Sequence, residues 1–208
     1  MSIATVLALG DSTTAGTPGF QSPIEAPPHG AGNAESQYAY WLMRAQPQWR
    51  VLNHGVNGER SDQIRRRLAR DILDRSIDVI VLIAGVNDIY QNRSAEVVER
   101  ELEAMFDLAA SAPRSIPVVA GSILPYNTAT AEQNRRMHEV NRWLRDYSRT
   151  HLAVKFCDTR AAAADPAVPD RLGSSPDGLH PGPEGYRLVA LALEPVIRQI
   201  LEARQART

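Results

Sequence analysis

The chain has 208 residues, 43% of them hydrophobic, which is enough to bury one sizeable core and little for two, so we expect a single domain over residues 1–208. Its 23 Lys and Arg against 24 Asp and Glu give a formal net charge of -1, which argues against nucleic acid or an anionic membrane as partner. A small molecule suits this charge better.

The single cysteine, Cys157, excludes an internal disulfide and a zinc site built from several cysteines. It ends an aliphatic segment, so a buried apolar role is favoured over a reactive thiol. No apolar stretch is long enough to span a bilayer, and the first aliphatic segment follows directly on Met1 and Ser2. These features favour a cytoplasmic protein. The alternative is an exported protein whose leader has been removed.

Short aliphatic segments alternate with helical patterns along the chain. The aliphatic segments lack the polar alternation of a half-exposed sheet, as is typical of strands buried on both faces. We expect strands at residues 3–9, 50–54, 77–84, 116–121 and 153–156. Strands and helices in alternation predict an α/β fold of three layers, α/β/α, around a doubly wound parallel sheet with strand order 2-1-3-4-5.

The segments between the strands repeat apolar residues at helical spacing. We expect helices at residues 37–45, 61–73, 94–110, 131–150 and 183–203. The last helix opens on Pro183, and Pro195 is expected to kink it. Residues 161–176, with an alanine run and several prolines, are expected to form a long surface loop. The residues expected to face inward are Ile64, Leu68, Ile72, Val98, Leu102, Met105, Phe106, Ala109, Met137, Val140, Leu144 and Tyr147.

Four polar clusters follow the ends of strands, where open α/β sheets bind their ligands. They are Gly10-Asp11-Ser12 after the first strand, "GVNGERS" (55–61) after the second, "GVND" (85–88) after the third and "DGLHPGPEGY" (177–186) after the fifth.

Together these blocks resemble those of the GDSL or SGNH hydrolases. "GDSTTAG" is similar to the first family block, although Thr13 stands where an aliphatic residue is more usual, and the other three clusters resemble the later blocks in family order. The resemblance extends from Gly10 to Tyr186. It implies a flavodoxin-like, five-stranded sheet, an esterase or lipase-like activity, and a catalytic triad of Ser12, Asp177 and His180.

The chemistry of the three residues fits this role. A serine hydroxyl is a poor nucleophile that needs a base, and the base needs an orienting group. On a turn, Asp177 can meet Nδ1–H of His180 while Nε2 faces Ser12 Oγ. The alternative, a surface Asp-Gly turn with a solvent-exposed histidine, is the better interpretation of that segment alone but not beside the other blocks.

Acyl transfer also needs donors aimed at the oxyanion. The backbone N–H groups of Ser12 and Gly58 and the side-chain amide of Asn87 can supply them, and the resemblance implies the same three. The alternatives are an ordinary turn glycine and a turn-forming asparagine.

Asp11 and Asp88 are expected to shape turns. Asp11 shapes the turn that presents Ser12, and Asp88 caps the turn that follows Asp88 itself. No HExxH motif or paired His and carboxylate spacing occurs, so we expect neither a metal nor another cofactor. The run Arg65-Arg66-Arg67 with Arg70 is interpreted as a solvated, ion-paired helix face, and nucleic-acid binding is the weaker alternative.

Two loops are candidates for substrate contact. Residues 17–37 leave directly from the nucleophile turn and either wall the site or form a disordered insertion. Residues 124–134 form a second candidate wall, with Tyr126 and Asn127 positioned to contact substrate. The small, polar composition of both loops favours a short acyl group or an acetylated sugar over a long fatty chain.

The sequence thus predicts a serine esterase that acts on a small-molecule ester through an acyl-enzyme. A thioesterase or lysophospholipase of the same family is an alternative. Two others come from different classes: a catalytically silent binding protein, and a phosphoacceptor signalling domain with Asp11, Asp88 and Lys155 as its charged groups. The oligomeric state is left open.

Overall fold

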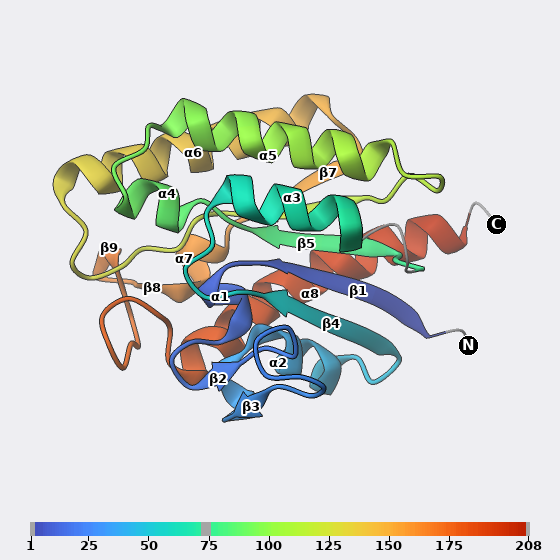
Figure 1. Cartoon of the computed structure of the whole chain (residues 1–208), viewed down its shortest axis with the longest axis horizontal. Coiled ribbons are helices and arrows are strands. Elements are labelled where there is room, and N and C mark those ends of the chain that lie inside the picture. The colour runs from blue at the N-terminus through green and yellow to red at the C-terminus, as the bar shows by residue number, and fades with distance from the viewer. Residues whose placement is uncertain (1–2, 72–75, 207–208) are drawn as a thin grey trace.

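A parallel sheet forms the centre of the computed structural model, which describes residues 3–71 and 76–206 (Figure 1). The order β4-β1-β5-β6-β7 is the predicted order 2-1-3-4-5, and all four pairings are parallel. The three-layer, flavodoxin-like α/β fold is therefore confirmed. The strands are β1 (Ala4–Gly10), β4 (Trp49–Gly55), β5 (Val79–Ile83), β6 (Val118–Gly121) and β7 (Val154–Cys157).

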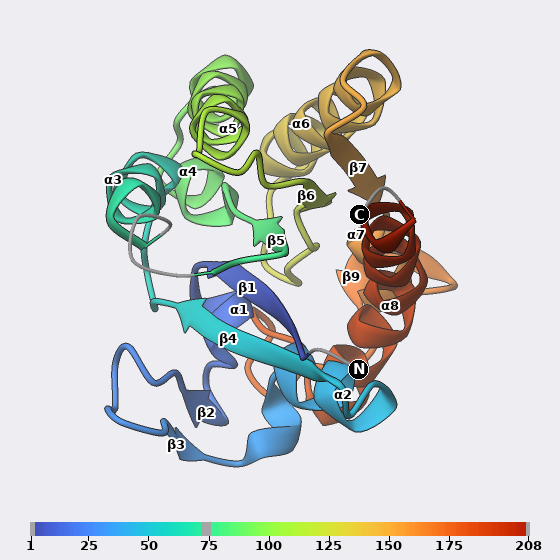
Figure 2. The same ribbon diagram turned by 90° about the vertical axis from the view of Figure 1, so that its right-hand side faces the viewer.

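Helices cover both faces of the sheet (Figure 2). On one face, α3 (Ser61–Asp71), α5 (Ala95–Ala110) and α6 (Ala131–Thr150) bury their apolar residues against the strands. On the other face lie α2 (Tyr38–Ala45) and α8 (Pro183–Gln205). Each layer therefore has its own apolar core, with the sheet between them.

The predicted inward-facing residues of α5 and α6 are buried, except Tyr147, which is half-buried and packs against Phe106 and Trp143. On α3, Ile64 and Leu68 are buried as predicted, whereas Ile72 lies outside the described residues. Helix α8 opens on Pro183 and continues through Pro195. None of the helices described is long and apolar enough to cross a membrane.

The prediction of a loop over residues 161–176 was wrong. This segment contains the end of α7 (Thr159–Ala163) and a hairpin of β8 (Ala164–Asp165) and β9 (Val168–Leu172). The Asp158 side chain caps α7 by accepting a hydrogen bond from Ala161 N, and alanine is the best helix former. Of the prolines in this segment, Pro166 lies in the turn of the hairpin and Pro169 within β9.

Residues 17–37 are ordered, which rules out the disordered-insertion alternative. They contain β2 (Phe20–Gln21), β3 (Ala31–Gly32) and the 3-10 helix η1 (Ala34–Ser36), which lie near α2 in Figure 1. Fully buried Ser22 donates a hydrogen bond to the Gly55 carbonyl at 2.6 Å. The segment is thus anchored to the end of β4.

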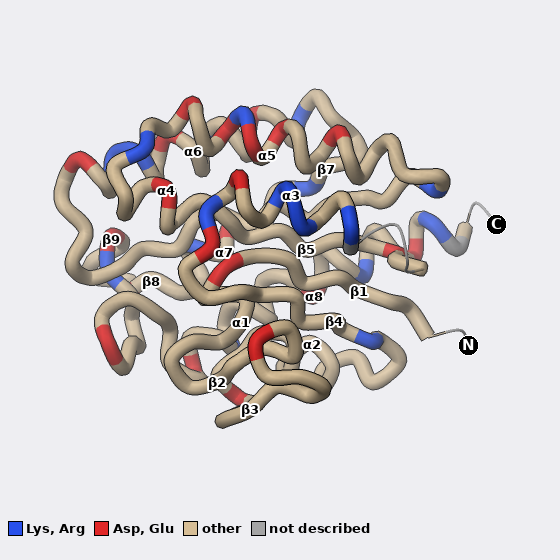
Figure 3. The backbone as a smooth tube through the Cα atoms, viewed as in Figure 1, with Lys and Arg blue, Asp and Glu red and all other residues tan. Residues whose placement is uncertain are grey.

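Acidic and basic residues are interspersed on α3, α5 and α6 (Figure 3). On α3, Arg65 pairs with Glu101 at 2.5 Å and Arg66 with Asp62 at 3.1 Å, as predicted for a solvated, ion-paired face. The same prediction was wrong for Arg67, whose side chain is only 7% exposed. Its buried position is explained by carbonyl partners at the ends of two strands.

Cys157 is buried at the end of β7, as predicted for an apolar role. Its Sγ lies 3.3 Å from the Ala192 carbonyl, and burial raises the pKa of the thiol to about 12. A thiol with such a raised pKa holds almost no thiolate near neutral pH, so it is a poor nucleophile.

Candidate active site

Ser12 lies at the carboxyl end of β1, as the first residue of the short helix α1 (Ser12–Ala15). Asp11 caps this helix, with Oδ1 accepting a hydrogen bond from Thr13 N at 2.9 Å, so it shapes the turn as predicted. Gly10 leaves no room for a side chain, because a Cβ there would collide with the Ile83 carbonyl and the Thr14 side chain. The strand therefore turns sharply and leaves the serine hydroxyl at the sheet edge.

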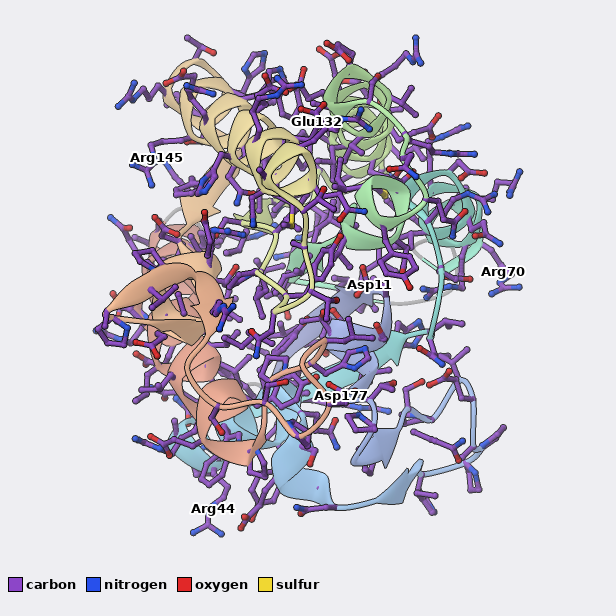
Figure 4. All side chains as sticks on the ribbon, turned by 90° about the vertical axis from the view of Figure 1, so that its left-hand side faces the viewer. Asp11, Arg44, Arg70, Glu132, Arg145 and Asp177 are labelled. Carbon is purple, nitrogen blue, oxygen red and sulfur yellow. The ribbon has the colours of Figure 1, made fainter. Side chains whose placement is uncertain are left out.

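The structure brings Ser12, His180 and Asp177 into one hydrogen-bonded chain. His180 Nε2 lies 3.0 Å from Ser12 Oγ, and His180 Nδ1 lies 2.7 Å from Asp177 Oδ2. Asp177 and His180 belong to the loop that precedes α8 (Figure 4). The distances suit a nucleophile, a general base and its orienting carboxylate.

Hydrogen bonds keep the Asp177 carboxylate ionised. Partial burial alone would raise its pKa, but bonds from the His180 side chain and from the backbone N–H groups of Leu179 and His180 hold the pKa below its usual value. A carboxylate that stays charged fixes the tautomer of His180 with its proton on Nδ1. Nε2 is then free to accept the serine proton.

The turn that carries Asp177 and His180 is braced from two sides. Ser175 Oγ donates to the His180 carbonyl at 2.7 Å and accepts from Gly178 N at 2.8 Å. Asn127 N donates to the Gly178 carbonyl at 2.7 Å. Gly178 has a φ of +76°, which a residue with a side chain rarely adopts. Sequence reasoning missed Ser175, whose only signal was its place just before the last block.

The position of Asn127 does not support the predicted substrate contact. Its Oδ1 accepts a hydrogen bond from Leu172 N at 2.8 Å, and the residue is absent from the lining of the cavity at Ser12. Asn127 instead links β9 to the Asp177 turn. Local sequence placed it near the site, but its partners lie about 50 residues further along the chain.

The three predicted oxyanion donors follow the ends of neighbouring strands β1, β4 and β5, and two of the residues, Ser12 and Asn87, line one cavity. Among the described residues, neither the Ser12 N–H nor the Gly58 N–H has a protein acceptor. Gly58 has a φ of +76°, and nothing lies within 4 Å of the position of a Cβ. Asn87, on α4 (Val86–Tyr90), donates one Nδ2 hydrogen to the Glu59 carbonyl at 2.9 Å and keeps the other. These groups can serve as an oxyanion hole.

A cavity of about 200 Å³ opens over Ser12, Asn87 and His180. Its apolar walls are the side chains of Val86, Tyr90, Tyr126 and Leu179. No residue of 17–37 lines it, so the structure does not support the prediction that this segment walls the site. A larger cavity of about 500 Å³ is lined by residues of α6 and β7 and by none of Ser12, Asp177 and His180.

Tyr126 is one of these walls, as predicted. It is buried, its ring meets the edge of Tyr90 with centroids 6.0 Å apart, and its hydroxyl has no partner among the described residues. Burial raises the pKa of the phenol to about 12, so the hydroxyl keeps its proton. A protonated hydroxyl without a partner beside the cavity can bond a bound molecule after a small movement.

Asp88 was predicted to cap the turn that follows it, but its carboxylate caps a helix. Its Oδ2 accepts from Ser61 N at 2.8 Å and its Oδ1 from Ser61 Oγ at 3.0 Å, so it caps α3 instead of the turn that follows it. Lys155 lies within β7, which β5 and β6 separate from β1 and hence from Asp11. No group of three or more His, Cys, Asp or Glu within residues 3–71 and 76–206 could hold a metal ion.

Asp11 is buried beside the nucleophile, and its Oδ2 has no partner among the described residues. Burial raises the pKa of its carboxyl to about 7, helped by the negative charges of Asp88 and Glu59 and opposed by the bond from Thr13 N. Because this pKa lies above its ordinary value of 3.8, the folded state binds more protons than the unfolded chain. Stability is therefore lost as pH rises from about 4 to about 7.

Asp11→Asn should reduce the loss of folding stability that accompanies rising pH. The amide oxygen can still cap Thr13 N, and no charge is buried. We compare the free energy of unfolding of the variant with that of wild type. From pH 5 to pH 8 the difference should shift in favour of the variant by about 2 to 4 kcal/mol. Urea unfolding of both proteins at the two pH values measures this gain. A difference between the proteins that does not change with pH would contradict the prediction.

Comparisons with known proteins agree with the geometry. The sequence profile of the GDSL-like Lipase/Acylhydrolase family matches residues 8–188. No curated protein sequence gives a significant match.

Three solved structures share the fold. A lipolytic G-D-S-L family protein from Veillonella parvula has a TM-score of 0.75 at 19% identity, with 94% of this chain and 99% of that chain covered. A carbohydrate acetylesterase family member from Sinorhizobium meliloti has a TM-score of 0.75 at 22% identity, covering 96% and 99%. An aryl esterase from M. smegmatis has a TM-score of 0.74 at 16% identity, covering 95% and 100%.

Proposed function

The chain belongs to the GDSL-like lipase/acylhydrolase family, and from this premise we propose that it is a serine esterase that hydrolyses carboxylic esters through an acyl-enzyme on Ser12. One observation carries the proposal: the hydrogen-bonded chain from Ser12 Oγ to His180 at 3.0 Å and on to Asp177 at 2.7 Å. Ser12 and His180 both line a cavity with apolar walls.

In the first half of the reaction, Ser12 Oγ attacks the ester carbonyl carbon while His180 Nε2 takes its proton. The charge that develops on the carbonyl oxygen is met by the N–H groups of Ser12 and Gly58 and by the free Nδ2 hydrogen of Asn87. His180 then gives its proton to the leaving alcohol as the ester C–O bond breaks. Asp177, ionised throughout, stabilises the imidazolium between these two transfers.

In the second half, water replaces the alcohol. His180 Nε2 takes a proton from water, whose oxygen attacks the acyl carbon, and the same three donors hold the oxyanion. The proton returns to Ser12 Oγ as the acyl bond breaks. The carboxylic acid leaves and the serine is restored.

Asn87→Ala should lower kcat by about 10² to 10³-fold and change KM little, because the lost donor acts on charge that exists only in the transition state. Asn87→Asp should lose at least as much, since a carboxylate of the same size repels the oxyanion. Steady-state kinetics on nitrophenyl acetate measure both variants. A rise in KM with kcat unchanged would contradict an oxyanion role and indicate substrate binding alone.

The small cavity supports a short acyl group. Its volume of about 200 Å³ is shared by the acyl group and part of the alcohol, and Tyr90 and Leu179 are exposed at its rim. The buried hydroxyl of Tyr126 supports a polar contact with the alcohol, such as a sugar hydroxyl. Proteins of the same fold include a carbohydrate acetylesterase family member and an aryl esterase.

Substrate profiling tests this function. We expect kcat/KM on nitrophenyl esters to be highest from acetate to butyrate and to fall steadily for longer chains. Acetylated sugars, acyl thioesters and lysophospholipids, assayed in parallel, separate the carbohydrate esterase from its two alternatives. A maximum at long acyl chains, or turnover of thioesters alone, would overturn the short-acyl proposal.

A further inference from the structure

An arginine and a glutamate form an ion pair behind the candidate site. Arg67 projects from α3 with its side chain 7% exposed, and Glu59, in the loop after β4, has its side chain 17% exposed. Arg67 Nη2 and Nε lie 2.7 Å and 3.1 Å from Glu59 Oε2. Burying two charges is costly unless both are well paired, so this pair calls for an explanation beyond solubility.

The same guanidinium also binds the ends of two neighbouring strands. Its Nη1 donates to the His54 carbonyl at 2.8 Å, at the end of β4, and its Nη2 to the Gly10 carbonyl at 3.2 Å, at the end of β1. Five N–H donors in one rigid plane allow an arginine to bind several acceptors at once. Arg67 thus joins β1, β4 and the loop of Glu59 at one point.

Two of these attachments, at Gly10 and Glu59, lie close in sequence to donors assigned above to the oxyanion. Gly10 lies two residues before Ser12 in a turn with no space for a side chain. Glu59 directly follows Gly58, and its N–H closes the Gly58 turn on the Val56 carbonyl at 3.3 Å. The Glu59 carbonyl accepts the hydrogen bond from Asn87 Nδ2 at 2.9 Å. One side chain therefore contacts the segments that carry the Ser12 and Gly58 N–H groups, and the Asn87 amide is linked to it through the Glu59 residue.

We propose that the Glu59–Arg67 ion pair positions the oxyanion hole. The inference rests on the proposed esterase function and adds two positioning residues that do not touch the substrate. The carboxylate of Glu59 holds the Gly58 turn through Arg67, and the carbonyl of Glu59 orients the Asn87 amide. Because oxyanion donors act through accurate placement, a loosened pair reduces transition-state stabilisation more than ground-state binding.

The test compares Arg67→Lys and Glu59→Gln with Arg65→Lys, all on nitrophenyl acetate. Lysine keeps the charge at position 67, but its three donors share one nitrogen and cannot reproduce the planar spread of the guanidinium over Glu59, His54 and Gly10. We therefore expect kcat to fall about 10- to 100-fold with KM changed less than about threefold. Glu59→Gln keeps an acceptor oxygen and should fall about three- to tenfold. Arg65→Lys is the control, because Arg65 lies on the same helix as Arg67 but pairs with Glu101 of α5, and its kcat should stay within about twofold.

A double-mutant cycle separates positioning from general damage. In an Asn87→Ala background, part of what the pair positions is already gone, so we expect Glu59→Gln to cost less than about twofold in kcat and the loss from Arg67→Lys to shrink severalfold. Equal losses in both backgrounds would overturn the inference. If thermal unfolding shows that Arg67→Lys is not folded, the double-mutant cycle with Glu59→Gln decides the question alone.

Failure of this inference is distinguishable from failure of the proposed function. If wild type hydrolyses esters while Arg67→Lys and Glu59→Gln keep wild-type kcat, the positioning role is wrong and the esterase stands. If folded wild type hydrolyses no ester and Ser12 does not react with a fluorophosphonate, the esterase itself is wrong, and the positioning role falls with it.

Discussion

Ser12→Ala lowers kcat on nitrophenyl acetate by about 10⁴ to 10⁶-fold and abolishes labelling by a fluorophosphonate; this is the expected result if Ser12 is the nucleophile. Ser12 Oγ is the hydroxyl that lies 3.0 Å from His180 Nε2. Its removal should leave the fold intact, because the side chain that caps α1 belongs to Asp11. The residual rate comes from the oxyanion donors and from substrate binding, which the variant keeps.

Ser111→Ala is the matched control, since Ser111 lies exposed at the end of α5, away from the site. It should keep wild-type turnover and labelling. Near-normal turnover in Ser12→Ala would refute the acyl-enzyme mechanism. Folded wild type that neither turns over esters nor labels would favour the binding-protein alternative, and phosphorylation by acetyl phosphate with Mg²⁺ would favour the phosphoacceptor alternative.

The sheet and the four blocks were predictable because their signals are local. An aliphatic run reports a strand buried on both faces, and parallel strands place all their carboxyl ends at one edge. A polar block directly after a strand therefore has its place in space fixed by the strand order. For this reason Ser12, Gly58, Asn87 and His180 could be named before any coordinate was known.

Arg67 could not be placed this way, because its environment is set by distant residues. In sequence it belongs to an arginine run on an amphipathic helix, where its neighbours Arg65 and Arg66 are indeed exposed and paired. What buries Arg67 is the Gly10 carbonyl, 57 positions earlier, together with the His54 carbonyl and Glu59. Backbone carbonyls at strand ends leave no pattern of side chains in the sequence. Hydrophobic periodicity therefore cannot predict which arginine binds them.

Asn127 shows how a local signal leaves out distant partners. Its place after β6 predicted a residue at the carboxyl edge of the sheet. Its side chain is instead taken by Leu172 N of β9, an element that the sequence prediction assigned to a loop. Because the sequence analysis missed the hairpin, it also missed the hydrogen-bond partner of the Asn127 side chain.

His180→Ala should lower kcat by about 10⁴ to 10⁶-fold, and the double variant with Ser12→Ala should lose little more than either single variant. The two residues act as a unit, because a serine without its base remains protonated and a base without its serine has no proton to take. Additive losses would show that the two groups act in separate steps and would contradict the mechanism. Thermal unfolding of all three variants checks that each is folded.

The pH profile of wild type supplies an independent test of the same base. Activity should be lost at acidic pH, since only a neutral His180 ring can accept the proton of Ser12. The pKa of Asp177 is held below its usual value, so its carboxylate is still ionised where this loss occurs. Protonation of Asp177 should therefore not produce the acidic limb of kcat/KM. The residual activity of His180→Ala should lack that limb, and a limb retained in the variant would assign the ionisation to another group, with Asp11 the first to examine because its pKa is raised to about 7 beside the nucleophile.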